Sequence, residues 1–331
     1  MKKVVVTGGA GYIGSHTVRL LIQKGYDPLV VDNLSTGHRR NVDAGRLRVM
    51  DVADTGALAR LMESEGVPAV IHFAGFIAVG ESVREPERYF SNNVGGSLSL
   101  LSAMRLAGVS RIVFSSSAAV YGAPSGVPIS EDAPLAPLSP YGESKLMVEN
   151  VLRWLDQCAG VHSISLRYFN ACGADAAAGL GEEHEPETHL IPLALRAIRS
   201  GEPLTVFGDD YPTPDGTCIR DYIHVCDLAE AHILALEALL GGAKSAVYNT
   251  GAGAGHSVRE VLRAAEEVTG VRVPYTIGSR RAGDPPALVA DAARIRRELG
   301  WEPRITGLRE MVASAWEFER GRRGGRPGPV C

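Results

Sequence analysis

The chain has 331 residues, with 34 basic and 38 acidic side chains and a net charge of −4. This length suits one large α/β unit or about two domains. The two signs nearly balance and neither forms a long block, so the composition argues against binding to nucleic acid or to an anionic membrane surface. The five cysteines show no C-x-x-C spacing, which predicts no metal site and a reduced, cytoplasmic setting.

The amino-terminal segment begins with two lysines and a valine run but turns polar at Thr7-Gly8-Gly9. An apolar run this short predicts a buried strand and not an export signal. The sequence also lacks an apolar stretch of about 18 residues, so we expect no membrane span.

The first half of the chain alternates short β-branched runs with longer amphipathic stretches. This pattern is typical of β-α units that build a parallel sheet. Strands are predicted at 3–7, 28–31, 47–50, 69–73, 111–115 and 163–166. Helices are predicted at 12–24, 55–65, 87–107 and 141–158. The predicted fold class is α/β, a doubly wound parallel sheet of the Rossmann type with a smaller mixed α/β substrate lobe.

The regular alternation of strand and helix patterns becomes irregular after residue 170, and a second lobe is expected there. Further helices are predicted at 190–200, 225–240, 257–269, 291–299 and 306–320. The resulting division assigns 1–169 to a cofactor-binding domain, with 221–250 returning to it because that stretch again reads strand, helix, strand. Residues 170–220 and 251–320 form the substrate lobe, and 321–331 are expected to be a disordered tail.

Glycines recur as Gly9-x-Gly11-x-x-Gly14 directly after the first strand and at the start of the first helix. Such a turn lets a pyrophosphate approach the helix amino terminus, where free N–H groups favour anions. An ordinary glycine-rich β-α turn is the alternative. The flanking strand and helix favour a dinucleotide site.

Acidic residues end the next two predicted strands. Asp32 lies 18 residues after Gly14, where a carboxylate accepts hydrogen bonds from both ribose hydroxyls and repels a 2′-phosphate. NAD is therefore favoured over NADP, although Arg39 and Arg40 leave the phosphorylated cofactor open. Asp51 lies where a carboxylate meets the adenine amino group, or it simply begins the next helix.

Tyr141 and Lys145 are four residues apart on a predicted helix and so share a face. A nearby ammonium favours the phenolate, which is a base. Free tyrosine has a pKa near 10, so action at neutral pH needs a lowering of about 3 units, to be supplied by Lys145 together with a nicotinamide cation. The serine run 115–117 ends a strand at the sheet edge where ligands bind, and a hydroxyl there can relay the substrate proton.

These motifs together resemble the UDP-glucose (UDP-galactose) 4-epimerase family of the extended short-chain dehydrogenases/reductases, from residue 1 to about 320. The resemblance is carried by the sequence segments 7–16, 32–34, 72–75, 78–82, 92–94, 114–117, 120–122, 139–145, 166–170, 207–213 and 215–224. The last two are the most specific, because they belong to the nucleotide-sugar lobe.

The resemblance implies a role for each matching position. It implies that Tyr141 is the base, Lys145 its activator and ribose anchor, and Ser117 the proton relay. The implied cofactor contacts are Gly8, Gly11, Tyr12, Ile13, Gly14, Asp32, Asn33, Asp51, Val52, Phe73, Ala74, Gly75, Asn92, Ser117, Tyr141, Lys145, Tyr168 and Phe169. The implied substrate contacts are Ser117, Tyr141, Asn170, His189, Leu190, Phe207, Arg220, Arg281, Asp284 and Leu288. Arginines recognise a diphosphate well, which supports Arg220 and Arg281 independently, with surface ion pairing as the plainer interpretation.

Three positions depart from the family pattern. Ile77 stands where many relatives have a lysine near the nicotinamide ribose, so one charged contact to NAD is missing. His189 replaces an asparagine of many members. Leu288 is intermediate in size at a position that limits room beside the sugar, so acceptance of UDP-N-acetylhexosamines stays open.

The expected activity is reversible NAD-dependent epimerisation at C4 of a UDP-hexose through a 4-keto intermediate. The alternatives are a 4-epimerase of another nucleotide sugar, such as UDP-arabinose/xylose or UDP-glucuronate, and a catalytically silent NAD-responsive binding protein. A dehydratase is disfavoured because Ala118 and Ala119 stand where such relatives carry an Asp-Glu pair. The family also implies a homodimer paired through helices at 87–107 and 141–158.

Overall fold

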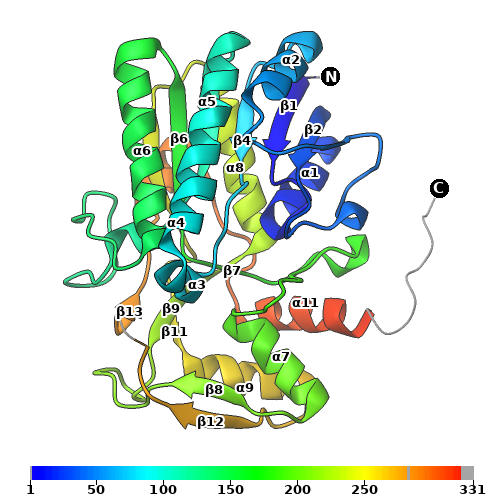
Figure 1. The fold of residues 1–331 in the computed structure, drawn as a ribbon. Helices are drawn as coiled ribbons and strands as arrows, with labels where there is room; N and C mark the ends of the chain where they lie inside the picture. Colours follow the sequence, from blue (N-terminus) through cyan, green and yellow to red (C-terminus); the bar gives the residue numbers. More distant parts are fainter. Residues whose placement is uncertain (1, 282–283, 322–331) are drawn as a thin grey trace.

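The computed structural model describes residues 2–281 and 284–321, so most of the predicted tail lies outside the described residues. Its centre is a seven-stranded parallel sheet with the strand order β10-β6-β5-β4-β1-β2-β3 (Figure 1). The strands are β1 (Lys2–Thr7), β2 (Tyr26–Asp32), β3 (Leu47–Val49), β4 (Val70–His72), β5 (Arg111–Ser117), β6 (His162–Tyr168) and β10 (Ala246–Thr250). This arrangement confirms the predicted doubly wound fold.

Both faces of the sheet are covered by helices (Figure 1). The helices α1 (Tyr12–Gln23), α8 (Val225–Leu240) and α10 (Ala293–Leu299) share one apolar core with the sheet. The helices α2 (Thr55–Glu65), α5 (Gly96–Leu106) and α6 (Pro140–Ala159) share the core on the other face. The valines 4–6 of β1 are fully buried because helices shield the strand on both sides.

The strand order reverses between β1 and β4, where the connections leave toward opposite sides. In open parallel sheets this reversal opens a crevice at the carboxyl ends of the strands, and ligands bind there. The glycine turn follows β1, and Phe73 follows β4, so the predicted cofactor residues border this crevice.

The predicted continuous helix at 87–107 is interrupted. It consists of α4 (Pro86–Tyr89), a π-helical segment (Phe90–Gly95) and α5, preceded by a short α3 (Val79–Arg84). Wider π-helical turns commonly occur at functional sites. Here the turn carries Asn92 and Asn93, and Asn93 Nδ2 donates to Ser144 Oγ of α6 at 3.1 Å.

A smaller part of the molecule lies below the carboxyl edge of the sheet in Figure 1. Its strand β9 (Ile219–His224) pairs with β7 (Asn170–Cys172), β11 (Gly255–Ser257) and β13 (Ala287–Leu288), while β8 (Leu204–Phe207) pairs with β12 (Tyr275–Gly278). The helices α7 (Leu190–Ser200), α9 (Val258–Thr269) and α11 (Leu308–Gly321) pack around a third apolar core. Five strands of two to four residues escaped prediction because such short segments have little periodicity, namely β7, β8, β11, β12 and β13.

The described helices include none that is both long and apolar enough to span a lipid bilayer.

Candidate active site

The glycine turn forms a tight backbone cradle at the start of α1. Gly8 has a φ of +69°, and a side chain at Gly14 would place its Cβ only 2.2 Å from the Gly8 carbonyl oxygen. Gly11 precedes the helix without a side-chain cap, so the first N–H groups of α1 stay available to a ligand. This cradle fits the pyrophosphate of a dinucleotide.

Asp32 lies beside the cradle with its carboxylate held by the backbone. Its Oδ2 accepts from Ala10 N at 2.9 Å and its Oδ1 from Leu34 N at 2.8 Å. The remaining lone pairs suit the two hydroxyls of an adenosine ribose. Arg40 forms an ion pair with Glu183 at 2.6 Å, so this guanidinium is already engaged with a carboxylate and offers little support for a 2′-phosphate.

Other predicted cofactor residues gather at the same edge. Asn33 Nδ2 donates to Asp51 Oδ2 at 2.9 Å, which joins the ends of two neighbouring strands. Val52 faces Gly96, where an added Cβ would lie 3.0 Å from it. Ala74 lies against Gly8, where a Cβ would be 2.6 Å from the Ala74 nitrogen.

The nicotinamide end of the predicted site is lined by rings and amides. The Phe73 ring lies 4.6 Å from that of His232, and Tyr168 OH pairs with Ser115 Oγ at 2.6 Å. The backbone N–H of Phe169 bonds to Thr250 of β10. Gly75 lies at this end, where an added Cβ would be 3.8 Å from Lys145 Nζ, and Asn92 lies on the π-helical turn. The remaining predicted cofactor residues, Tyr12 and Ile13, lie in the first turn of α1.

The three predicted catalytic residues come together at the end of β5 and the first turns of α6. Ser139 caps α6 and Pro140 opens it, so Tyr141 and Lys145 point from the first turns toward β5. Lys145 Nζ donates to Ser115 O at 2.8 Å and lies 5.8 Å from the Tyr141 ring centre. Ser117 lies close enough to Tyr141 to lower the pKa of its phenol. The spacing in the sequence therefore predicted a real juxtaposition.

The pKa of Tyr141 is raised in this structure, although Lys145 lies near its ring. Burial raises the pKa of the Tyr141 phenol, and the nearby Ser117 only partly opposes this. The side chains of the protein alone therefore do not supply the lowering that a base at neutral pH needs. If Tyr141 acts as the base, a cation bound beside it has to supply this lowering.

Lys145 is buried, and this lowers its pKa to about 8, although Glu149 opposes the shift. Below pH 8 the ammonium is present, and above it the positive charge near the Tyr141 ring is lost. We expect kcat/KM to fall at alkaline pH, with an apparent pKa of about 8 or lower. The apparent pKa can be lower because a cationic nicotinamide lowers the pKa of Lys145 further. The contribution of Lys145 to folding stability changes with pH in the opposite direction to the expected activity. The folded state loses this proton more readily than the unfolded chain, so stability from Lys145 rises between about pH 8 and the unfolded value near 10.5.

Parallel pH profiles of kcat/KM and of the unfolding midpoint test this prediction. An alkaline limb well above pH 8, or one that follows the unfolding midpoint, would contradict it.

A buried ion pair behind the catalytic residues was missed by the sequence analysis. Arg167 of β6 binds Glu149 of α6 with an Nη2–Oε2 distance of 2.6 Å, and Ser116 Oγ donates to the same carboxylate. Arg167 also donates to Tyr121 OH at 3.0 Å. The pair fastens α6 to β5 and β6. Glu149 lies one turn after Lys145 on the same helix face, which was an available signal, whereas its partner is distant in the sequence.

The predicted diphosphate residues meet on one side of the smaller part. Arg281 Nε donates to Asp284 Oδ2 at 2.8 Å, and Arg220 Nη2 lies 3.5 Å from Asp284 Oδ1. The Arg281 guanidinium also stacks over Phe207, with 5.0 Å to the ring centre. Leu288 of β13 is the register partner of Arg220 on β9. Asp284 thus links the two arginines, and both remain partly exposed to a ligand.

The other predicted substrate residues have their own supports. Asn170 Nδ2 donates to Asp221 O at 3.0 Å. His189 and Leu190 stand at the start of α7. Burial opposes a charge on His189, but Glu182 and Glu187 outweigh it and raise the pKa of His189 to about 10. These two glutamates were also missed by the sequence analysis.

The fold and this site define a class: a Rossmann-type short-chain dehydrogenase/reductase of the extended kind. The chain belongs to the NAD dependent epimerase/dehydratase family, whose sequence profile matches residues 4–251.

Relatives match almost the whole chain. A UDP-glucose 4-epimerase of Azospirillum brasilense is 52% identical over 320 residues, 96% of this chain and 92% of the relative. One from Lactobacillus helveticus is 49% identical over 96% of this chain and 97% of its own length. The crystal structure of UDP-glucose 4-epimerase from Brucella ovis in complex with NAD superposes with a TM-score of 0.93, at 48% identity, covering 96% of this chain and 98% of that one.

Proposed function

We propose that this protein is an NAD-dependent nucleotide-sugar 4-epimerase that interconverts UDP-galactose and UDP-glucose through a 4-keto intermediate. The observation that carries the proposal is the position of Tyr141, Lys145 and Ser117 at the crevice edge, next to the glycine cradle, in a chain about half identical to UDP-glucose 4-epimerases.

The residues at the cradle fit NAD. The free N–H groups at the start of α1 face the pyrophosphate, Asp32 takes the adenosine ribose, and Lys145 anchors the ribose of the nicotinamide. When bound, NAD supplies a reversible hydride acceptor for C4 of the sugar. Ile77 is 37% exposed and offers no charge, so the cofactor keeps one contact fewer than in relatives with lysine there.

The proton of the 4-hydroxyl is handled by the protein. Ser117 lies next to Tyr141 and can complete a path from a substrate hydroxyl to the phenol. The Lys145 ammonium stabilises the phenolate once the proton has moved. Because inversion needs the proton returned after the sugar has turned over, the same tyrosine serves as base and then as acid.

The nucleotide has to be held while the sugar turns. Arg220 and Arg281 suit this task because they sit in the smaller part, away from Tyr141, and guanidinium groups bind a diphosphate at two points. Asp284 lies between them and keeps both side chains oriented. Phe207, under Arg281, offers a flat apolar face beside the nucleotide.

The decisive experiment is incubation of the purified chain with UDP-galactose and no added NAD, followed by separation of the products. Formation of UDP-glucose is expected, because the resident cofactor is regenerated in each turnover. A panel of UDP-N-acetylhexosamines, pentoses and UDP-glucuronate then ranks the substrates. Release of bound NAD on denaturation, without turnover of any sugar nucleotide, would point instead to a silent NAD-binding protein.

We further propose a homodimer paired through the helical layer of α5 and α6. Large apolar side chains are exposed on these helices, including Trp154 at 56%, Leu106 at 72% and Met147 at 41%. A second copy would cover them. We also propose the division into a cofactor-binding domain, 1–169 with 221–250, and a substrate lobe, 170–220 with 251–320. The cytoplasmic setting is a proposal as well. The cytoplasmic setting is supported by the free cysteines among the described residues, which are Cys158, Cys172, Cys218 and Cys226.

A further inference from the structure

The loop before α7 carries a cluster of side chains that the proposed reaction does not use in full. In the pattern E-x-H-x-x-E-x-H, Glu182, His184, Glu187 and His189 each offer one nitrogen or oxygen atom, and the four atoms lie within 4.8 Å of one another. His184 Nδ1 lies 3.1 Å from Glu182 Oε1, and His189 Nδ1 lies 3.0 Å from Glu187 Oε1. A tetrahedral zinc ion with ligands at about 2.0–2.1 Å holds them roughly 3.3 Å apart, close to these two separations. His189 Nδ1 also lies 2.5 Å from Glu182 Oε1, so this pair has to move apart when an ion binds.

Burial and charge also favour a cation here. The Glu182 and Glu187 side chains are only 5% and 0% exposed, so two carboxylates share a space of low polarity. Glu187 Oε2 is buried and has no hydrogen-bond partner among the described residues, and Arg196 Nη2 lies 3.9 Å away, beyond hydrogen-bond distance. Buried carboxylates need a paired charge or a metal ion. His189 pairs with both carboxylates here, and a divalent ion would supply the second positive charge.

We propose that Glu182, His184, Glu187 and His189 form a binding site for a divalent zinc-type cation. Two imidazoles and two carboxylates neutralise such an ion and suit zinc better than magnesium or calcium, which prefer oxygen ligands throughout. On binding, the metal takes the lone pair of each imidazole nitrogen, and any proton there is released to solvent. The cysteine spacings predict no metal site, and these histidines and glutamates are a separate signal in the sequence.

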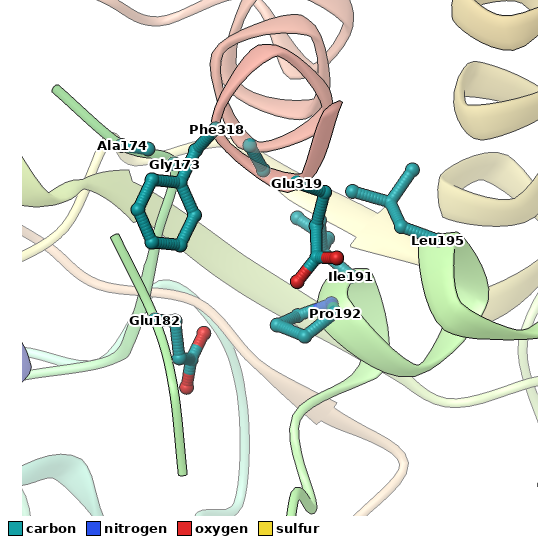
Figure 2. A pocket seen from close by; sticks show the side chains of 9 residues that line it. Gly173, Ala174, Glu182, Ile191, Pro192, Leu195, Phe318 and Glu319 are labelled. Carbon is teal, nitrogen blue, oxygen red and sulfur yellow. The ribbon is translucent and has the colours of Figure 1, made fainter. Parts of the chain in front are cut away.

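The position of the site gives the ion a structural role. Neighbouring Glu183 is held from the cofactor side, through His38 Nε2 at 3.2 Å to its carbonyl and Arg40 to its carboxylate. Glu182 also lines a small cavity between α7 and α11 (Figure 2). Ligation of His189 through Nδ1 leaves its Nε2–H free, so the ion would orient this residue toward a ligand.

Metal titration of the untagged full-length chain tests the proposal. After treatment with a chelator, the protein is titrated with Zn²⁺ by calorimetry and with Co²⁺ by visible spectroscopy. We expect one ion per chain and the intense d–d bands of tetrahedral cobalt. Glu187→Gln and His184→Asn should each weaken binding by about 10- to 100-fold or more.

The matched control is Glu185→Gln, which removes the same charge from an exposed residue of the same loop and should bind as the native chain does. Absence of saturable binding to the native chain would overturn the proposal. So would equal affinity in Glu187→Gln, His184→Asn and Glu185→Gln, because cysteines or the surface would then hold the ion. If His184→Asn does not fold, X-ray absorption on the native zinc protein decides by counting imidazole ligands, with fewer than two contradicting the site.

Discussion

Replacing Tyr141 with phenylalanine is expected to lower kcat by about 10²- to 10⁴-fold, the usual contribution of a positioned acid or base. The ring stays in its buried position at the start of α6, so the substitution removes the hydroxyl without opening a large cavity. UDP binding should be unchanged, because the arginines proposed to hold the diphosphate lie in the other part of the molecule. Steady-state kinetics with UDP-galactose and calorimetry with UDP measure the two effects.

The matched control for this substitution is Tyr275→Phe, on the exposed strand β12. It removes the same hydroxyl far from the crevice and should leave kcat within experimental error. Near-normal turnover of Tyr141→Phe would refute the assignment of the base. A loss of UDP affinity equal to the loss of turnover would show that the substitution disturbs the whole site.

Replacing Arg167 with methionine is expected to destabilise the protein by about 3–5 kcal/mol, because it leaves the Glu149 carboxylate buried without its partner. Arg167 is 4% exposed and Glu149 is 8% exposed, so water cannot readily replace the lost interaction. Urea unfolding followed by circular dichroism measures the change. Since the pair fastens α6 to β5 and β6, turnover should fall as well.

The control for this prediction is the double variant Glu149→Met/Arg167→Met. Removing both charges avoids an unpaired buried ion, so the double variant should be more stable than Arg167→Met alone. The single variant Glu149→Met completes the cycle. If the double variant loses at least the sum of the two single losses in stability, the pair is not coupled as the distances indicate. Arg297→Met tests the same change at a solvent-exposed pair with Glu298 and should cost little.

Much of the site was predictable from local patterns. The glycine turn after β1, Asp32 at the end of β2, and the shared face of Tyr141 and Lys145 depend on residues close in the sequence. The periods of helices and strands place such residues together wherever the element forms. The π-helical turn at 90–95 was not predictable, because its hydrogen bonds to α6 come from packing and its sequence resembles that of the adjoining helix.

Long-range placement needed the three-dimensional structure. The strand β10 joins the sheet beside β6, which lies more than 70 residues earlier in the chain, and Asn249 near the end of β10 accepts a hydrogen bond from Tyr121. The two glutamates and two histidines of the segment 182–189 are visible in the sequence, but only the folded loop shows that their four ligand atoms lie close together.

The sequence by itself determined the parallel α/β architecture, the dinucleotide turn and the tyrosine–lysine pair, because these follow from backbone sterics and short periodic patterns. Only the tertiary structure decided the protonation behaviour of those groups. Burial raises the pKa of Tyr141 and lowers that of Lys145, and the degree of burial depends on helices and strands that are far apart in the chain.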